Sequence, residues 1–152
     1  MKNLASVRKL VIHHSESPMA KTTVSFIQAI HLVEKKWPAI GYHAMIDIKG
    51  TVHPGRSEML AGAHAYGLNQ HSLGVCVFGN FDRESPRPEQ WQSLIRVLEK
   101  WCRKYRIAAD TNTILGHCDV PGTTKSCPGA NLYRYLPWLR QEVTKRLSTQ
   151  SR

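Results

Sequence analysis

The sequence lacks an apolar run of roughly 18 residues, the length that a membrane-spanning helix needs. Its first ten residues, MKNLASVRKL, contain no apolar stretch of the kind found in a secretory signal peptide. Internal repeats and low-complexity tracts are also absent. We therefore expect a soluble chain without an export signal of its own, and 152 residues is the usual size of one domain.

Acidic residues are scarce, since 11 Asp and Glu face 21 Lys and Arg and leave a formal net charge of +10. This charge suits an anionic partner such as nucleic acid, acidic lipid or an acidic wall polymer. A basic surface that only keeps the chain soluble is the alternative. Neither a zinc-finger spacing nor an aromatic ribonucleoprotein motif is present, so we expect no specific nucleic-acid recognition.

The four cysteines include no Cys-x-x-Cys pair, which argues against a structural zinc finger. A chain without a signal peptide meets a reducing compartment first, and there cysteine serves metal binding or catalysis more often than disulfides. Cys76 lies in an apolar run and Cys102 in a helical stripe, so both are expected to be buried packing residues.

Strands are predicted where a short apolar run ends at glycine or at polar residues. One such stretch is interrupted by glycine in its middle, which indicates a tight turn between two strands. The predicted strands are 9–14, a pair within 39–56 that turns at Lys49-Gly50, 72–80 and 113–117.

Apolar residues at helical spacing predict three helices, at 22–37, 88–105 and 131–147. Pro88 stands at the first position of the second helix, and Pro137 requires a short turn before the third helix proper. Strands that alternate with helices indicate an α/β domain with a central, mixed and mostly parallel β-sheet flanked by about three α-helices. The first helix is expected to be capped by Thr22 or Thr23 and to bury Phe26, Ile27, Ile30, Val33 and Trp37.

Two predicted strands end in a histidine, at His13 and at His117. Ligands gather beyond the carboxyl ends of strands in open α/β sheets, so parallel neighbours would bring both imidazoles to one point. Cys127 follows His117 across a loop of glycine and proline that can fold back toward the sheet. Two histidines and one cysteine suit Zn²⁺, which in catalytic sites keeps three protein ligands and an open position for water.

Each of these residues also has an ordinary interpretation, because a single histidine at a strand end is usually only hydrogen-bonded and a single cysteine usually packs in the core. The neighbours His14 and Cys118 are expected to point to the opposite face and to pack. His31 and His53 are not expected at the metal, whereas His71 is a candidate for the rim of a groove.

Four motifs stand in order along the chain: VIHHS (11–15), GYHAMIDIKGTVHPGR (41–56), GAHAYGLNQHSLGVCVFGNFD (62–82) and GHCDVPGTTKSCPG (116–129). Together they resemble the zinc-dependent N-acetylmuramoyl-L-alanine amidases, which include T-odd phage lysozymes and animal peptidoglycan recognition proteins. The phage-lysozyme branch is most similar, because it also carries a lysine two residues before the ligand cysteine.

The resemblance implies the fold of the peptidoglycan recognition proteins and a single amidase domain over 1–152. Its core is expected at about 9–139, with flexible ends at 1–8 and 148–152. Asp119 is expected either to orient a ligand histidine or to cap the loop. The implied zinc ligands are His13, His117 and Cys127, one ion per chain, with Tyr42 and Lys125 beside the metal's water and His64 and Asn69 lining the substrate groove.

Amide hydrolysis needs a nucleophile, an oxyanion stabiliser and a proton donor for the leaving amine. Zinc supplies an activated water and polarises the carbonyl. Lys125 can stabilise the oxyanion and Tyr42 can donate a hydrogen bond to it or relay a proton, unless they are a solvated loop lysine and a packed tyrosine. Some relatives carry a catalytic glutamate where Cys76 stands and an aspartate as third ligand. Both positions hold cysteine here, which gives more weight to Tyr42 and Lys125.

The leading hypothesis is a zinc-dependent amidase that cuts between the lactyl group of N-acetylmuramic acid and the L-alanine of the peptidoglycan stem peptide. Without a signal peptide or a wall-binding domain, the chain resembles a phage or prophage endolysin, which accumulates in the host cytoplasm and reaches the wall through a holin. The alternatives are a cytoplasmic muropeptide-recycling amidase, a non-hydrolytic peptidoglycan-binding or regulatory module and, on charge alone, a nucleic-acid-binding protein. We expect a monomer, and the sequence does not reveal a regulatory partner such as a phage polymerase.

Overall fold

The computed structural model describes residues 1–149 of the chain. Its centre is a five-stranded sheet with the strand order β3-β2-β4-β1-β5. Every neighbouring pair of strands is parallel except β2 and β3, which form an antiparallel hairpin. This sheet confirms the predicted mixed, mostly parallel arrangement. The strands are β1 (Lys9–His14), β2 (Ala44–Ile46), β3 (Val52–Pro54), β4 (Ser72–Val77) and β5 (Ile114–Gly116).

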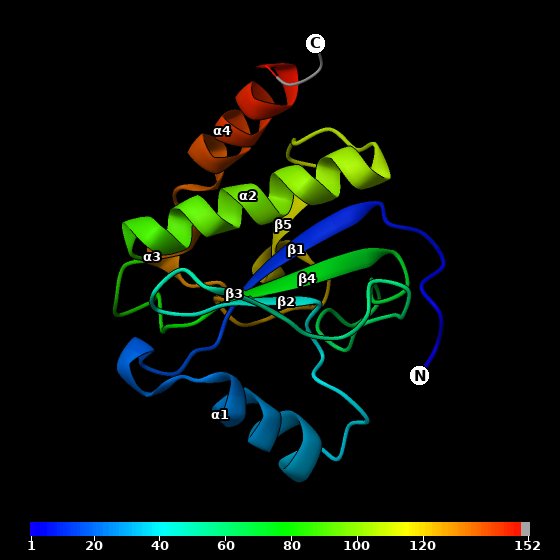
Figure 1. Ribbon diagram of the computed structural model, residues 1–152, viewed down its shortest axis with the longest axis vertical. Coiled ribbons are helices and arrows are strands. Elements are labelled where there is room, and N and C mark those ends of the chain that lie inside the picture. Colours follow the sequence, from blue (N-terminus) through cyan, green and yellow to red (C-terminus); the bar gives the residue numbers. More distant parts are fainter. Residues whose placement is uncertain (150–152) are drawn as a thin grey trace.

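Helices cover both faces of the sheet, with α2 and α4 on one side and α1 on the other (Figure 1). The longest helix, α2, spans the predicted residues, begins with Pro88 in its first turn and ends where Arg106 adopts a left-handed backbone with φ of 56°. Among residues 1–149, no helix is long and apolar enough to cross a membrane. The helices are α1 (Val24–Gln28), the π-helix η2 (Ala29–Glu34), α2 (Pro88–Tyr105), α3 (Ala130–Tyr133) and α4 (Leu136–Thr149), with 3₁₀ turns η1 (Met19–Lys21) and η3 (His117–Asp119).

The larger hydrophobic core lies between the sheet and the two helices α2 and α4. Alternate strand residues such as Leu10 and Ile12 enter it, because successive side chains of a strand point to opposite faces. His14 follows this alternation, and its Nδ1 accepts a hydrogen bond of 3.0 Å from the backbone N–H of Phe81. His13 therefore faces the other side of the sheet, as predicted. Cys76 and Cys102 are both buried, which was also predicted.

The first helix differs from its prediction in the second half. Thr23 caps it, since its hydroxyl oxygen accepts a hydrogen bond of 3.1 Å from the backbone N–H of Phe26. From residue 29 to 34 the helix is π-helical, and its wider turns move the apolar stripe out of register. His31 consequently turns inward with 6% of its surface exposed, while Val33 is 71% exposed. The predicted stripe is wrong at Val33, which lies in the π-helical turns, and also at Phe26, which precedes them in α1 and is 38% exposed.

The N-terminal segment, residues 1–8, was predicted to be a flexible end, and its backbone makes hydrogen bonds to the rest of the domain. The backbone N–H of Leu4 donates to the carbonyl of Met59 at 2.9 Å, and the N–H of Arg8 donates to the carbonyl of His71 at 2.9 Å. These bonds tie the segment to the loop before β4. These hydrogen bonds join backbone groups that are distant in sequence, so they could not be predicted from a side-chain pattern.

The C-terminal helix α4 begins beside Pro137, which sits in its first turn as predicted. The guanidinium of Arg140 donates from Nε to the carbonyl of Ile114 at 3.0 Å and so holds α4 against β5. The helix continues to Thr149. It therefore includes the first residues of the segment 148–152, which we expected to be flexible. Residues 150–152 of that predicted end lie outside the described residues.

Candidate active site

The predicted ligand triplet comes together at the carboxyl edge of the sheet. β1 and β5 are parallel neighbours, and His13 lies near the end of β1 while His117 directly follows β5. The loop after η3 returns Cys127 to the same edge. One ligand atom from each of His13, His117 and Cys127 lies within 4.8 Å of the other two.

The donor set fits a zinc ion. The Cys127 Sγ lies 3.8 Å from Nδ1 of His13, and the ring centroids of His13 and His117 are 4.5 Å apart. Imidazole nitrogen and thiolate sulfur are the ligands that zinc prefers, whereas magnesium and calcium prefer oxygen. His13 and Cys127 are buried and His117 is half-buried, so the fourth side of the triplet is left to the adjoining pocket.

Burial sets the protonation of the metal-free triplet. It lowers the pKa of His13 well below the usual value, and the charges of His64 and His117 lower it further. Burial also lowers the pKa of His117, with a smaller effect from the charge of Lys125. The thiol of Cys127 is affected in the opposite sense, since burial raises its pKa to about 12. At neutral pH the rings are therefore neutral and the thiol is protonated.

Zinc binding at pH 6 is expected to release fewer than two protons per ion, because a metal displaces protons only from ligands that carry them. Cys127 has one proton to lose, whereas the lowered pKa of His13 and His117 leaves each ring less protonated than an ordinary histidine. Two histidines with an ordinary pKa would raise the release to roughly 2.5 protons. Calorimetry in buffers of different ionisation enthalpy measures this number, and a value above two would contradict the assignment.

The triplet lies in a pocket of about 450 Å³. The sequence predicted four other members of this pocket: Tyr42, Lys125, His64 and Asn69. All four line it, and so do nine residues that sequence reasoning did not assign to it. Those residues are His14, Ser15, Glu16, His31, Lys35, Trp37, Ala63, Ala65 and Tyr66.

Tyr42 stands beside the predicted ligand His13, and the two ring centroids are 5.1 Å apart. Burial raises the pKa of its hydroxyl well above the usual value, and the nearby thiols of Cys76 and Cys127 raise it further. The phenol therefore stays protonated and can donate a hydrogen bond. Lys125 is exposed on the loop before Cys127 and also lines the pocket.

His64 and Asn69 direct their polar atoms toward the protein. Nδ1 of His64 lies 2.9 Å from Nε2 of His13, and Nε2 of His64 lies 3.4 Å from the hydroxyl of Ser72. The side-chain carbonyl of Asn69 accepts hydrogen bonds from the backbone N–H groups of His64 and Ala65, at 3.0 and 2.9 Å. Burial lowers the pKa of His64 to about 3, so its ring is neutral at physiological pH.

Asp119 makes contacts that favour the loop-capping alternative. Its carboxylate accepts one hydrogen bond of 3.0 Å from the backbone N–H of Gly116 and another of 2.6 Å from the hydroxyl of Tyr133. Both bonds brace the turn that carries His117, and neither reaches the ring of a ligand histidine. Cys118 is half-buried, and its backbone N–H donates to the carbonyl of Cys127 at 2.7 Å.

Three further histidines, His53, His71 and His31, lie outside the predicted ligand triplet. His53 pairs with Asp47 at 2.8 Å on the β2–β3 hairpin, as expected for a residue outside the site. His71, suggested for the rim of the groove, does not line the pocket itself. It lines an adjoining hollow that shares Tyr66 and Asn69 with the pocket, and its Nδ1 lies 2.9 Å from the Ser6 hydroxyl. His31 is in the pocket wall, where its Nδ1 accepts a hydrogen bond of 3.0 Å from the N–H of Gly41.

Comparisons with known proteins agree with this geometry. The family model described as N-acetylmuramoyl-L-alanine amidase matches residues 3–130. The endolysin of Escherichia phage T7 is 34% identical to this chain over 148 residues, which cover 93% of this chain and 92% of that protein.

Solved structures give the same result. The N-acetylmuramoyl-L-alanine amidase LysC from Clostridium intestinale URNW has a TM-score of 0.77 and 32% identity, with 94% of this chain and 86% of that chain covered. The Drosophila peptidoglycan recognition protein SD has a TM-score of 0.78 and 26% identity, with 90% and 83% covered. These matches confirm the fold and the enzyme class that the four motifs implied. The chain belongs to the N-acetylmuramoyl-L-alanine amidase family.

Proposed function

We propose that this amidase is a zinc enzyme of the endolysin type, which cuts the amide between the lactyl group of N-acetylmuramic acid and the L-alanine of the stem peptide. The observation that carries the proposal is the convergence of His13, His117 and Cys127 on one point of the pocket. These three residues would hold one zinc ion, which when bound supplies an activated water and polarises the scissile carbonyl.

Two other side chains act on the substrate. The Tyr42 hydroxyl, kept protonated by burial, donates a hydrogen bond to the carbonyl oxygen as it gains negative charge. The ammonium of Lys125 stabilises the same charge from the loop on the open side of the pocket. Asp119 acts indirectly, because its bonds to Gly116 and Tyr133 hold the turn on which His117 stands.

Tyr42→Phe and Lys125→Met are each expected to lower kcat by about 10²-fold, the usual effect of removing one oxyanion donor. Neither side chain is a ligand in this proposal, so zinc affinity should stay within about twofold of the wild type. Steady-state kinetics on a soluble muropeptide, with zinc titrations in parallel, measure both quantities. A variant with full kcat would remove that residue from the mechanism.

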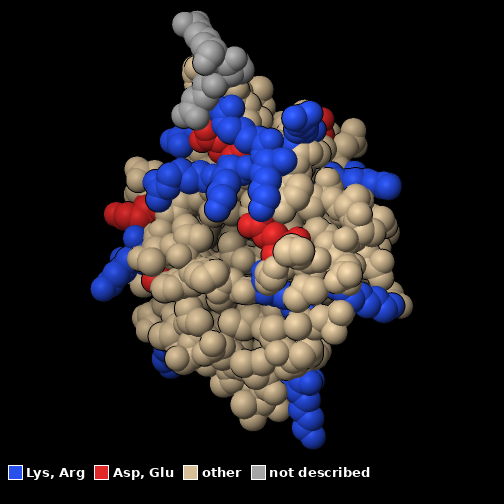
Figure 2. Space-filling model, turned by 45° about the vertical axis from the view of Figure 1, so that its right-hand side comes forward, with Lys and Arg blue, Asp and Glu red and all other residues tan. Residues whose placement is uncertain are grey.

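Peptidoglycan is the proposed substrate. One solved relative, with 26% identity and a TM-score of 0.75, is a complex of the peptidoglycan recognition proteins LCa and LCx with tracheal cytotoxin. Lysine and arginine side chains gather on the upper part of the face in Figure 2, which suits an anionic envelope. The proposed route is that of the endolysins: a monomer collects in the host cytoplasm and reaches the wall through a holin. A muropeptide-recycling amidase would use the same chemistry on soluble fragments.

The test is muropeptide release from purified Gram-negative sacculi by zinc-loaded protein and by chelator-stripped protein. We expect free stem peptides, identified by mass, from the zinc-loaded sample only. Intact sacculi in both samples, despite one bound zinc per chain, would favour the non-hydrolytic binding module. Cleavage of soluble muropeptides with intact sacculi would favour the recycling enzyme.

A further inference from the structure

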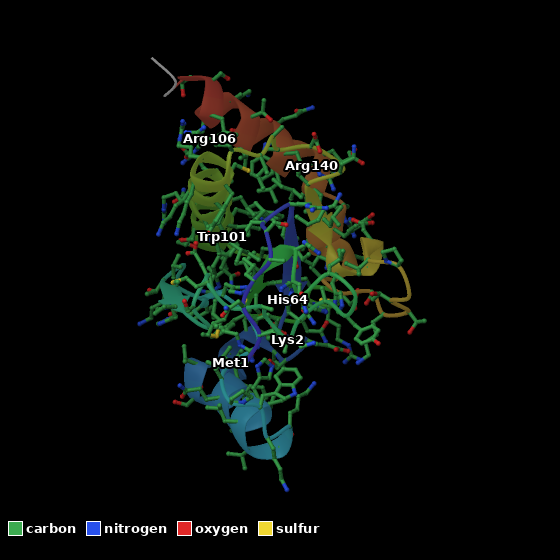
Figure 3. All side chains as sticks on the ribbon, turned by 90° about the vertical axis from the view of Figure 1, so that its right-hand side faces the viewer. Met1, Lys2, His64, Trp101, Arg106 and Arg140 are labelled. Carbon is green, nitrogen blue, oxygen red and sulfur yellow. The ribbon has the colours of Figure 1, made fainter. Side chains whose placement is uncertain are left out.

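We propose that His64 is a positioning residue for the metal ligand His13. A chain of hydrogen bonds through Ser72 and His64 fixes which ring nitrogen His13 presents to the metal. The inference rests on the proposed zinc centre, and it gives His64 a different role from the substrate-binding one that its motif implied. Figure 3 shows His64 near the middle of the molecule, with α1 below it and α2 above it.

The donor and acceptor roles in this series of hydrogen bonds are set at its far end by a backbone carbonyl, because a carbonyl oxygen can only accept a hydrogen bond. The hydroxyl of Ser72 donates its one hydrogen to the carbonyl of Leu68 at 2.8 Å. The Ser72 oxygen therefore turns lone pairs toward Nε2 of His64, 3.4 Å away. Nε2 of His64 must carry the hydrogen in this arrangement, because two facing lone pairs would repel each other.

The same logic continues to the metal ligand. A neutral imidazole carries one hydrogen, so a hydrogen on Nε2 of His64 leaves Nδ1 as an acceptor. His13 donates to it from Nε2 at 2.9 Å. Nδ1 of His13 is then the nitrogen with the free lone pair, and it is the one that faces Sγ of Cys127 at 3.8 Å. The hydrogen bonds through Ser72 and His64 thus select the tautomer of His13 whose Nδ1 is free to bind a metal.

The backbone packed around His64 holds its imidazole ring in one position. A Cβ atom on Gly74 of β4 would lie 2.6 Å from Cγ and Nδ1 of His64, and one on Gly62 would lie 2.5 Å from Cδ2. Both positions need glycine for this close approach. Asn69 fixes the backbone at His64 through the two hydrogen bonds described above.

The neighbouring His43 does not compete for the nitrogens of His64. Its Nδ1 accepts a hydrogen bond of 3.1 Å from the N–H of Gly74, and its Nε2 donates to the carbonyl of Leu60 at 2.9 Å. Its ring meets that of His64 edge to face at a centroid distance of 5.7 Å. The acceptor on His64 is therefore available to His13 alone among the contacts of the described residues.

The test compares three replacements of His64 by zinc affinity, measured with a competing chelator. His64→Leu removes the acceptor. His64→Gln keeps a polar side chain but carries its oxygen beyond the position of Nδ1, whereas His64→Asn places an oxygen near that position. Outer hydrogen bonds to a ligand histidine typically contribute 10–100-fold in affinity, so Leu and Gln should lose about that much and Asn should stay within a few-fold of wild type.

A matched control is His31→Asn, another buried histidine of the pocket, whose Nδ1 bonds to Gly41 and not to a ligand. It should keep wild-type zinc affinity. Spectra of the cobalt-substituted proteins give a second readout, since a rotated His13 alters the ligand-field bands. Thermal unfolding of each zinc-free variant separates lost affinity from lost folding, and the Gln and Asn pair decides the question if the Leu variant does not fold.

Zinc affinities of His64→Leu and His64→Gln within twofold of wild type would overturn the inference. A wild-type protein that binds no zinc would overturn the proposed metal centre instead. NMR of the zinc-free protein tests the hydrogen bonds to His13 independently of that result. Long-range ¹H–¹⁵N spectra should show His13 as its Nε2–H tautomer in the wild type and in His64→Asn. An Nδ1–H tautomer in the wild type would contradict the hydrogen-bond chain directly.

Discussion

Replacing Cys127 by serine is expected to abolish amide hydrolysis and to remove tight zinc binding. Cys127 is the only one of the three converging residues that can supply a negative charge to the metal. A neutral hydroxyl is a poor zinc ligand, and two imidazoles alone do not complete the site. Lewis-acid stabilisation contributes several kcal/mol to such a transition state, so the rate should fall by about 10³-fold or more.

Cys118→Ser is the matched control for this variant. The two cysteines are joined by a backbone hydrogen bond, but Cys118 is not among the residues whose ligand atoms converge. Its replacement should leave both the zinc content and the release of stem peptides at wild-type levels. Equal loss in the two variants would show that the serine substitution disturbs the loop, and full activity in Cys127→Ser would rule out a thiolate-bound metal.

The zinc-free protein is expected to lose most of its stability as the pH falls from about 7 to about 5, because several histidines are buried in their neutral form. Their pKa is lowered in the folded state, so the unfolded chain binds more protons below its ordinary histidine pKa of about 6.5. Stability is therefore present above that pH and decreases as the pH falls. The histidines with a lowered pKa are His13, His14, His31, His43, His64 and His117.

The size of this effect follows from the linkage between protons and folding. Each histidine that stays neutral when folded contributes about 1.4 kcal/mol per pH unit once the unfolded chain is protonated. The summed loss from a few such histidines over one to two pH units is comparable to the roughly 5–15 kcal/mol free energy of unfolding of a typical domain. Urea unfolding of the zinc-free protein between pH 5 and pH 8 measures the slope.

His31→Gln provides the comparison, because burial lowers the pKa of His31 to about 4 and keeps it neutral throughout this range. The variant should have a shallower slope by about 1.4 kcal/mol per pH unit below the ordinary histidine pKa. A free energy of unfolding that is the same at pH 5 and pH 8 in the wild type would contradict the buried neutral histidines.

Much of the fold could be predicted because local patterns agree with the tertiary structure. The apolar run at 9–14 and the periodic stretch at 88–105 became β1 and α2 with the predicted bounds. Strand alternation also separated His13 from His14, since one faces the pocket side and the other faces Phe81. The convergence of His13, His117 and Cys127 could be predicted from strand ends and loop composition, which are properties of short segments.

The remaining features depend on groups that are far apart in sequence. α-helical and π-helical turns have similar compositions, so the inward turn of His31 left no sequence signal. The hydrogen bond from His13 to His64 joins residues on separate segments, and only the folded backbone gives its direction. The resemblance predicted that His64 and Asn69 line the pocket, and both do. The hydrogen-bond partners of their polar atoms could not be predicted, because they depend on the folded structure.

The position of β1 in the sheet has a consequence for how the chain folds. β1 is the first strand in sequence but sits between β4 and β5, and its pairing with Ile114 on β5 spans roughly 100 residues. During synthesis the backbone N–H and C=O groups along one edge of β1 have no strand partner until β4 emerges, and those along the other edge have none until β5 emerges. Contacts of such high sequence separation form slowly. Catalytic competence therefore has to wait until β5 and the loop that carries Cys127 have emerged from the ribosome, long after β1.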